Sequence, residues 1–434
     1  MKVLLIGGGG REDALAWALR RSELLDTLHC APGNAGIARH AECLPLGAEQ
    51  VDEIVRHVAA ERYDLVVVGP EAPLVAGLGD RLREGGTPVF GPSAAAAEIE
   101  GSKVFSKLFM SRQAIPSARF QVFGDAAEAR GFLESQDAVY PLVVKADGLA
   151  AGKGVVIAGT RDSAVEAADG MLSGRSFGHA GRRIIVEELL QGREASCFVL
   201  ADGERFVELA SCQDYKRAFD GDQGPNTGGM GTYSPSAYLD AELRRTILET
   251  IVRPSIQGLA AENRPYHGVL YIGLMLTDDG PKVLEYNARF GDPETQVLMP
   301  RLDGDWLALL HACATGGLDG NPLRWKEEAC VCVVMAAPGY PGSYPKGSPI
   351  DGIETVEQSG KVELFHAGTA RDESGRLVTN GGRVLGVSAL ERDVATAREA
   401  AYDAVGRIRW EGVYYRTDIA FDAVGRSVTG SGKP

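Results

Sequence analysis

The chain has 434 residues, of which 44% are hydrophobic and 24% are charged, and its formal net charge is −14. This length predicts about three domains at roughly 150 residues each, and the composition favours buried cores over disorder. The acidic balance argues against nucleic acid or an anionic membrane as partners, because both select basic surfaces, and no apolar run approaches the roughly 18 residues of a membrane span.

The first hundred residues alternate between strand-like and helix-like segments. The opening run "MKVLLI" is too short for a signal peptide and predicts a buried strand over 2–6. An amphipathic helix is expected over 11–22, with further short strands at 27–31, 64–69 and 88–91. Strands separated by helices in this order predict a doubly wound α/β domain with a parallel sheet over residues 1–101.

A run of glycines, Gly7 to Gly10, follows the first strand and precedes the first helix. Backbone amides at a helix N-terminus suit an anion, so a phosphate site is the favoured interpretation. The dinucleotide fingerprint G-x-G-x-x-G fails here, because its third glycine would fall on Glu12 or Asp13. NAD binding and a purely structural turn stay open as alternatives.

Two further loops, "PGNAG" (32–36) and "GPEAPL" (69–74), follow the carboxyl ends of predicted parallel strands. Open α/β sheets bind ligands at that edge, and Glu71 stands in a loop stiffened by two prolines. Each loop alone is equally well explained as a turn. Together with the glycine run they face one edge of a crevice, which favours binding.

The stretch "LVVKADGLAAGKGVVIAG" (142–159) resembles a nucleotide-binding loop without matching the P-loop pattern G-x-x-x-x-G-K-[ST]. Asp147 stands where the first glycine should be, and Gly154 replaces the metal-binding hydroxyl after Gly152 and Lys153. The β-branched run that follows is typical of a strand. The loop therefore joins two strands and indicates another fold.

Two more segments suggest a ligand without defining it. "VEELLQGREAS" (186–196) could hold adenosine through Glu188, Leu190 and Glu194, although an exposed strand end with solvated carboxylates explains it as well. "QDYKRAFDGDQGPNTGGMGTYSP" (213–235) predicts a long glycine-rich loop, and such loops in compact domains are usually functional or disordered. Its glycines would let backbone amides approach an anionic substrate.

The sharpest pattern is "KVLEYNARFGDPE", the second half of a predicted hairpin with a turn at Asp279-Gly280. The period of two places Glu285, Asn287 and Arg289 on one face, and Leu284, Tyr286, Ala288 and Phe290 on the other, apolar face. A carboxylate and an amide oxygen can share Mg²⁺ with phosphate oxygens, and the arginine can contact a phosphoryl group or a carboxylate. A solvated strand face with paired charges is the alternative.

The last third, about 328–426, begins with the apolar run "CVCVVMAA" and continues with short strands, glycine-rich turns and a helix near 391–408. Cys330 and Cys332 are expected as core thiols, and a metal site is disfavoured. The seven cysteines lack paired spacing, which predicts a reduced, cytoplasmic protein.

A lysine on a strand (Lys145), a glycine-rich loop between strands, an acidic segment and a terminal E-x-N strand together resemble the ATP-grasp fold. Longer motifs, among them "GPEAPLVAG", "KADGLAAGKGV", "DGDQGPNTGGMGTYSP" and "EYNARFGDPETQV", are similar to the phosphoribosylamine–glycine ligase family from residue 2 to about 420. The resemblance implies a central α+β ATP-grasp domain over 102–327, with a lid subdomain near 120–190. It also implies an α+β C-terminal domain over 328–426, a tail over 427–434, and a monomer or weak homodimer.

The family's reaction joins glycine to 5-phosphoribosylamine and converts ATP to ADP and phosphate in purine biosynthesis. By resemblance, ATP would be bound by Lys107, Lys145, Gly152, Lys153, Gly154, Glu188, Leu190 and Glu194, and Mg²⁺ or Mn²⁺ by Glu285 and Asn287. Arg289, Asp214 and Lys216 would line the glycine and phosphoryl-transfer region. Phosphoribosylamine would be bound by Gly8, Gly9, Gly10, Asn34, Glu71 and Asp292. The implied route is a glycyl phosphate.

Two positions depart from the family pattern, which usually has His at Asp13 and at Tyr215. A carboxylate at Asp13 would stand near a phosphate, although an acid in a helix's first turn is itself favourable. Three other classes compete with this interpretation: a nicotinamide oxidoreductase, a nonenzymatic ATP sensor, and an ATP-grasp ligase acting on another acid.

Overall fold

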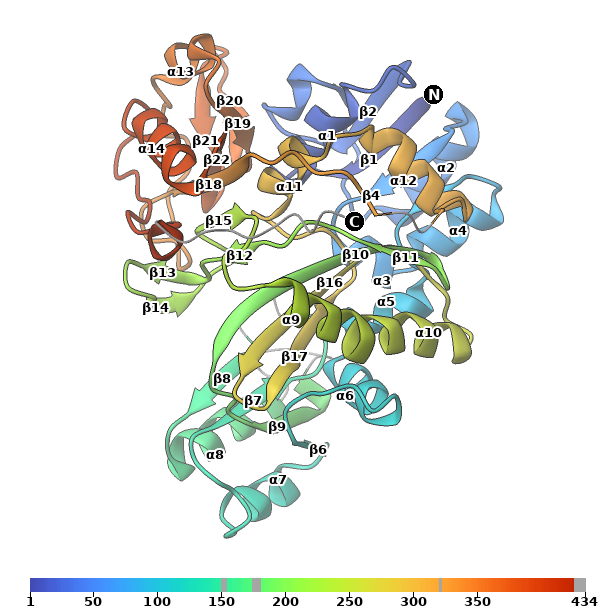
Figure 1. Cartoon of the computed structure of the whole chain (residues 1–434), viewed down its shortest axis with the longest axis vertical. Coiled ribbons are helices and arrows are strands. Elements are labelled where there is room, and N and C mark those ends of the chain that lie inside the picture. The colour runs from blue at the N-terminus through green and yellow to red at the C-terminus, as the bar shows by residue number, and fades with distance from the viewer. Residues whose placement is uncertain (150–153, 174–180, 320–321, 425–434) are drawn as a thin grey trace.

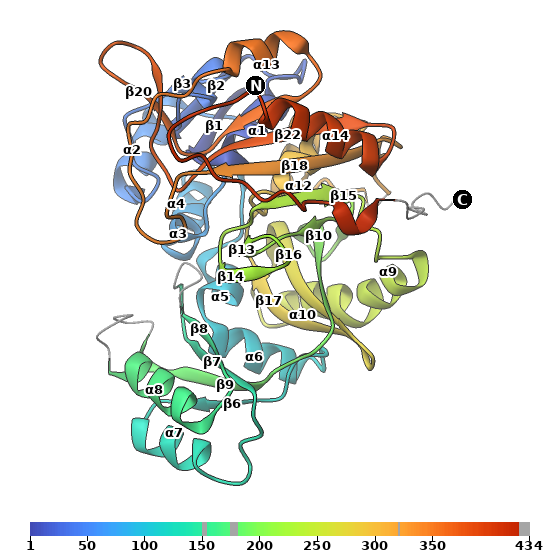
Figure 2. The same cartoon turned by 90° about the vertical axis from the view of Figure 1, so that its left-hand side faces the viewer.

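The computed structural model describes residues 1–149, 154–173, 181–319 and 322–424. Figures 1 and 2 show the N-terminal and C-terminal regions side by side at one end of the long axis, and a smaller lobe at the other end. Within these described ranges, no helix is both long enough and apolar enough to cross a membrane.

The N-terminal region is the predicted doubly wound domain. Its parallel sheet has the order β3-β2-β1-β4-β5, with β1 Lys2–Gly7, β2 Thr27–Pro32, β3 Glu42–Cys43, β4 Leu65–Val68 and β5 Val89–Phe90. The helical segments are α1 Gly10–Leu19, η1 Ile37–Arg39, α2 Val51–Glu61, α3 Glu71–Val75, α4 Leu78–Glu84 and α5 Ala94–Gly101. Strand β4 is buried along its whole length, which explains its continuous apolar sequence "LVVV".

Helix α1 differs from the amphipathic helix expected over 11–22. Every residue of α1 except Trp17 is buried, including Arg11, Glu12 and Asp13. The reason is that α1 packs against its own sheet and also against α11 (Thr295–Arg301) and β19 (Glu363–His366). A helix covered on both sides has no solvent face to carry a polar stripe.

The small lobe, or lid, contains the antiparallel sheet β6-β9-β7-β8 with two helices packed on it. Its elements are β6 Phe120–Phe123, α7 Ala126–Leu133, β7 Leu142–Ala146, β8 Val155–Ala158, α8 Arg161–Leu172 and β9 Ile184–Glu188, and α6 Lys103–Arg112 precedes them. Strands β7 and β8 pair antiparallel, so the glycine-rich loop does join two strands. The lid has a hydrophobic core of its own, around Leu142, Val144 and Ile184.

A larger antiparallel sheet, β11-β10-β16-β17, lies at the centre of the molecule (Figure 1). Its strands are β10 Arg193–Gly203, β11 Phe206–Glu208, β16 Tyr266–Thr277 and β17 Gly280–Asn287. One face packs on a helical run comprising α9 Ala241–Ile247, the π-helical turn Leu248–Val252 and α10 Arg253–Ala261, and the other on α12 Trp306–Thr315. The predicted hairpin is β16–β17.

The C-terminal region is built on a sheet that takes strands from two parts of the chain. In the order β12-β15-β18-β22-β19, the strands are β12 Gln213–Asp214, β15 Gly231–Ser234, β18 Ala329–Ala336, β22 Arg383–Glu391 and β19. Further elements are the hairpins β13 Arg217–Phe219 with β14 Gln223–Asn226 and β20 Thr369–Arg371 with β21 Leu377–Thr379, and the helices α13 Ile353–Ser359, α14 Val394–Val405 and η4 Phe421–Ala423. The prediction of a long loop over 213–235 was therefore wrong, because this segment forms four short strands. Cys330 and Cys332 are buried in β18.

Residues 414–422 fasten the β13–β14 hairpin to this sheet. The Tyr215 hydroxyl donates to Asp422 and accepts from the backbone N–H of Ala420 at 3.0 Å. The guanidinium of Arg416, which is only 1% exposed, lies 2.8 Å from Asp222 and 2.7 Å from Asp418. Tyr215, which lies between β12 and β13, thus ties the segment that carries Asp214 and Lys216 to the end of the described chain.

Candidate active site

Two lysines from different elements converge on one buried carboxylate between the lid and the central sheet. Nζ of Lys107, from α6, lies 3.3 Å from Glu187 Oε2, and Nζ of Lys145, from β7, lies 3.1 Å from Glu187 Oε1. Nζ of Lys145 is also 3.5 Å from the carbonyl oxygen of Leu284 in β17. Burial lowers the pKa of Lys107, although Glu187 opposes the shift. One carboxylate for two ammonium groups leaves excess positive charge, which suits phosphate oxygens.

Part of the expected phosphate loop lies outside the described residues, including Gly152 and Lys153. At its edges, the carbonyl of Gly154 accepts from the N–H of Ala146 at 2.9 Å, and Lys103 Nζ donates to the carbonyl of Gly148 at 2.8 Å. The described ends of the loop therefore approach α6 and the lysines of the cleft.

Glu188, Leu190 and Glu194 lie at or near the connection from β9 to β10. The Glu188 carboxylate accepts from the backbone N–H and Nε of Arg119, at 3.0 and 2.7 Å, so this side chain is used within the lid. Leu190 is buried. The Glu194 carboxylate lies 3.0 Å from Lys216 Nζ, on the side of the central sheet.

Glu285 is the acidic group around which the cleft lysines gather. Partial desolvation would raise its pKa, but Lys216, Lys145 and Lys103 outweigh that effect and hold the pKa below its usual value. The Lys216 ammonium is 4.0 Å away, and the Glu285 side chain remains 46% exposed. Its carboxylate is therefore ionised and open to a ligand.

Asn287 follows Glu285 at the end of β17, and its Oδ1 accepts from Arg289 Nη2 at 3.2 Å. The two oxygen donors fit a hard divalent cation that takes its remaining ligands from phosphate and water. Throughout the described ranges, no group of three or more His, Cys, Asp or Glu side chains is placed to hold a metal by itself. A cation at Glu285 and Asn287 would accordingly depend on the phosphates of a bound nucleotide.

Arg289 connects the cleft to the N-terminal domain. Its Nε lies 3.4 Å from Glu71 Oε2 at the start of α3, and its Nη2 lies 3.6 Å from Glu100 Oε1 in α5. Burial raises the pKa of Glu100 to about 7, Arg289 opposes the rise, and Glu71 adds to it. The guanidinium is thus held by two acidic groups, in addition to its contact with Asn287.

Asp214 and Lys216 lie with Glu294 in a desolvated cluster next to Arg289. Burial raises the pKa of Asp214 well above its usual value, Glu294 raises it further, and Lys216 opposes the rise. Among the described residues, Asp214 Oδ1 has no hydrogen-bond partner. The pKa of Lys216 is raised despite its burial, because Glu194, Tyr271, Glu285 and Asp214 surround it. The cluster offers an acidic oxygen beside two fixed cations.

A cavity of about 600 Å³ lies between the N-terminal and C-terminal regions. It is lined by five of the six predicted substrate residues, Gly8, Gly9, Gly10, Asn34 and Asp292. Glu71 is not among its lining residues and contacts Arg289 instead. The opposite wall comes from the C-terminal region and carries Thr369, Arg371, Asn380 and Arg383. Arg383 Nη2 lies 3.3 Å from Asp292 Oδ2, so an ion pair joins two residues that line the cavity.

Several of these residues were missed from the sequence. Glu187 stands next to Glu188 in an acidic strand end, and only the pairing of β9 with β7 shows that it faces Lys145. Glu294 could have been suspected from "GDPET". Arg371, Asn380 and Arg383 lie in glycine-rich turns without a motif of their own, and only the tertiary fold brings them to the cavity.

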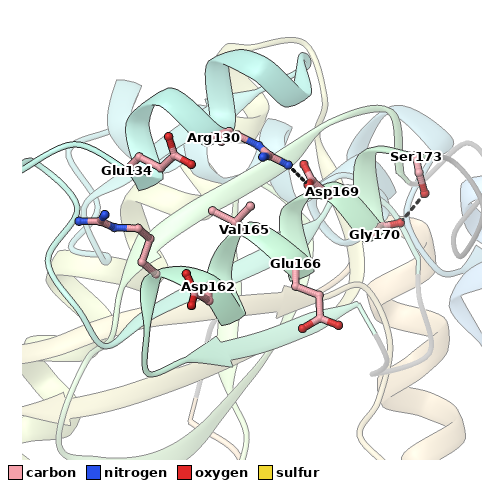
Figure 3. A pocket seen from close by; sticks show the side chains of 9 residues that line it. Arg130, Glu134, Asp162, Val165, Glu166, Asp169, Gly170 and Ser173 are labelled. Carbon is pink, nitrogen blue, oxygen red and sulfur yellow. Dashed lines mark hydrogen bonds and ion pairs between the residues drawn. The ribbon is translucent and has the colours of Figure 1, made fainter.

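A second cavity, of about 690 Å³, lies between α7 and α8 on the lid and is shown in Figure 3. Its side chains are mostly charged, and the ion pair of Arg130 with Asp169 spans the two helices. None of the predicted site residues lines it. This surface groove is therefore separate from the cleft.

A lid sheet and a central sheet that face each other across lysines and an E-x-N strand are the arrangement of ATP-grasp enzymes. Three profiles of the phosphoribosylglycinamide synthetase family match the chain: the N domain over residues 1–100, the ATP-grasp (A) domain over 101–295 and the C domain over 330–422. The chain belongs to this family of ATP-grasp ligases.

Individual relatives agree with the profiles. The chain is 50% identical to the phosphoribosylamine–glycine ligase of Rhizobium meliloti (strain 1021) over 426 residues, which covers 98% of this chain and 99% of that one. The crystal structure of the Thermotoga maritima phosphoribosylamine–glycine ligase superposes with a TM-score of 0.86 at 34% identity, over 97% and 100% of the two chains. A biotin carboxylase from Campylobacter jejuni, at 14% identity and a TM-score of 0.74 over 97% and 98% of the chains, shares the fold.

Proposed function

We infer that this chain catalyses the reaction of its family, the ATP-dependent ligation of glycine to 5-phosphoribosylamine, and we propose that a glycyl phosphate is the intermediate. The products are glycinamide ribonucleotide, ADP and phosphate, in de novo purine biosynthesis. The positions of residues 285–292 are the main support for this proposal. Glu285 faces the cleft lysines, Asn287 accepts from Arg289, and Asp292 lines the cavity between the terminal regions. One short segment therefore joins a polyphosphate site to a second substrate cavity.

In this proposal the nucleotide lies between the lid and the central sheet. Lys107, Lys145, Gly152, Lys153 and Gly154 are assigned to its phosphates, and Glu188, Leu190 and Glu194 to the adenosine. Glu285 and Asn287 would hold Mg²⁺ or Mn²⁺. A divalent cation bound there would neutralise negative charge on the phosphate oxygens. The excess positive charge around Glu187 and the ionised, accessible Glu285 support this orientation.

Glycine is assigned to the cluster of Arg289, Asp214 and Lys216. The Arg289 guanidinium would bind the glycine carboxylate, because its planar fork matches two carboxylate oxygens. Asp214 Oδ1, which has no hydrogen-bond partner among the described residues, would accept from the glycine ammonium and so gain one. Lys216, between Asp214 and Glu285, would stabilise charge on the phosphoryl group during transfer.

The chemistry follows from these positions. A carboxylate oxygen of glycine attacks the γ-phosphorus, and the bond to the leaving ADP oxygen breaks. The amine of phosphoribosylamine, held in the cavity with its phosphate near Arg371 and Arg383, then attacks the glycyl carbonyl carbon. Phosphate departs with the electron pair of the carbon–oxygen bond, and the amine loses a proton. The residues of the chain align the groups and exclude water from a hydrolysable intermediate.

The intermediate is tested with glycine labelled with ¹⁸O in its carboxylate. One labelled atom is expected in the released phosphate, since the bridging oxygen of a glycyl phosphate leaves with phosphorus. ADP formation should require both glycine and freshly made phosphoribosylamine. Label in AMP, or unlabelled phosphate from a productive turnover, would rule out the acyl-phosphate route.

Replacing Lys145 with methionine is expected to raise the KM for ATP by at least about 10-fold, because a phosphate-binding charge is lost from a partly desolvated cleft. The KM for phosphoribosylamine should stay near its original value. Lys361→Met, at an exposed lysine of the C-terminal region, is the matched control. An unchanged KM for ATP in steady-state assays would contradict the assignment of Lys145.

A further inference from the structure

Asp13 is a buried carboxylate in the first turn of α1. It is 0% exposed, and its Oδ2 accepts a hydrogen bond of 2.6 Å from the backbone N–H of His366, the last residue of β19. Arg39 Nη2 lies 3.5 Å from the same oxygen. Within the described residues Oδ1 has no hydrogen-bond partner, and His40 Nε2 is 4.0 Å from it. A side chain of the N-terminal domain therefore holds the backbone of the C-terminal region.

Asn34 contacts the backbone of His366 as well. Its Nδ2 donates to the carbonyl of His366 at 2.7 Å and to the carbonyl of Gly8 at 3.0 Å. Asp13 and Asn34 together thus hold the N–H and the C=O of His366. The five residues that follow His366, 367–371, all line the cavity between the terminal regions. The wall of the cavity therefore starts at a point fixed by two N-terminal side chains.

We propose that Asp13 is a positioning residue for the ribose-phosphate substrate: by holding the His366 N–H it fixes the cavity wall 367–371, without touching the substrate itself. This inference rests on the assignment of phosphoribosylamine to that cavity. Asp13 is absent from the cavity lining, so its effect must pass through His366 and the wall. A displaced wall would carry the groups that contact the ribose phosphate away from hydrogen-bond distance and so weaken its binding.

The charge of Asp13 changes with pH near neutrality. Burial raises the pKa of Asp13 to about 7, Arg39 and the His366 N–H oppose the rise, and Glu357 of α13 adds to it. Two thiols also face it, Cys30 of β2 and Cys43 of β3, and burial raises the pKa of both. His40 and His366 face it as well, and burial and Arg39 lower their pKa values to about 4 and about 3. Both rings are therefore neutral near pH 7. Above that pH Asp13 is ionised, and its bond to the His366 N–H becomes charge-assisted and stronger.

The test compares Asp13→Ala, which removes the acceptor, with Asp13→Asn, which keeps an oxygen of the same shape but cannot ionise. At pH 8, Asp13→Ala should raise the KM for phosphoribosylamine and the Kd of glycinamide ribonucleotide by at least about 10-fold, as expected for an orphaned buried N–H. The KM values for ATP and glycine should stay within about twofold. Glu23→Ala, at an exposed acid just beyond α1, is the control.

Asp13→Asn supplies a second measurement, which stands even if Asp13→Ala fails to fold. It should bind glycinamide ribonucleotide as the wild type does at pH 6, where Asp13 is mostly neutral, and about three- to fivefold more weakly at pH 8. Comparison with the wild type at each pH removes the titration of the ligand's own phosphate. Full-strength binding by Asp13→Ala, or an affinity ratio for Asp13→Asn that does not change with pH, would overturn the proposal.

Arg371→Ala separates this inference from the site assignment beneath it, because Arg371 lines the cavity directly. It should weaken binding of glycinamide ribonucleotide by at least about 10-fold if the cavity holds the ribose phosphate. If Arg371→Ala weakens binding and Asp13→Ala leaves it unchanged, only the role of Asp13 is rejected. Unchanged binding by both variants would reject the cavity assignment and the proposal with it.

Discussion

Glu285→Gln is expected to lower kcat by at least about 100-fold, the scale of losing one charge-stabilising group in an active site. The substitution keeps the size of the side chain and removes the charge around which Lys216, Lys145 and Lys103 gather. Those lysines would then lose the carboxylate that they share, although Lys145 keeps Glu187 and Lys216 keeps Glu194, and one of the two cation donors would be weakened. Steady-state turnover over a range of Mg²⁺ concentrations measures the effect.

The matched control is Asp279→Asn, the same change of carboxylate to amide at the exposed turn of the same hairpin. It should leave kcat unchanged, because Asp279 is exposed and its ion pair with Lys282 lies at the surface. Near-normal turnover by Glu285→Gln at ordinary Mg²⁺ would show that Glu285 is not a metal ligand.

Arg289→Lys should also lower kcat by at least about 100-fold, although it conserves the positive charge. A lysine cannot reproduce the planar fork that reaches Glu71, Glu100 and Asn287 at once. Glu100 would lose much of its compensating charge, so its pKa should rise further above about 7 and its proton should be held through neutral pH. Turnover and the KM for glycine are measured together.

Arg253→Lys on α10 serves as the control, since its ion pair with Glu249 is exposed on both sides. It should behave as the wild type. If Arg289→Lys turned over normally with an unchanged KM for glycine, the glycine assignment would have to move away from Arg289.

The sequence predicted elements well where local pattern and tertiary structure agree. The β16–β17 hairpin, the parallel N-terminal sheet and the strands on either side of residues 147–154 are present. The alternation in β17 was only partly right. A bulge opposite Gly273 and Leu274 shifts the register, so Val283 and Tyr286 share the buried side and Leu284 does not. The alternation of apolar and polar residues predicts a period of two, but it does not predict a β-bulge, which depends on the pairing with the neighbouring strand.

The errors have a common physical cause. Helix α1 lost its polar face because a strand more than 340 residues away covers it, as the bond from His366 to Asp13 shows. The segment 213–235 forms strands despite its glycines, because β15 finds a partner in β18. The cavity wall around Arg371 was missed for the same reason. Long-range partners decide these positions, and a single sequence does not contain them in local form.

The pairing of β15 with β18 also bears on how this protein can be recombined. In register, Thr232 faces Cys332 and Tyr233 faces Val331, so one half of this strand pair lies in the span matched by the ATP-grasp profile and the other in the span matched by the C-domain profile. A chimaera joined at the boundary between those two spans would combine β15 of one parent with β18 of the other. Asp214, in β12, would then lie beside a β15 that is paired with a β18 from the other parent. Segments 213–234 and 329–391 should therefore be exchanged together, as a single unit that is discontinuous in sequence.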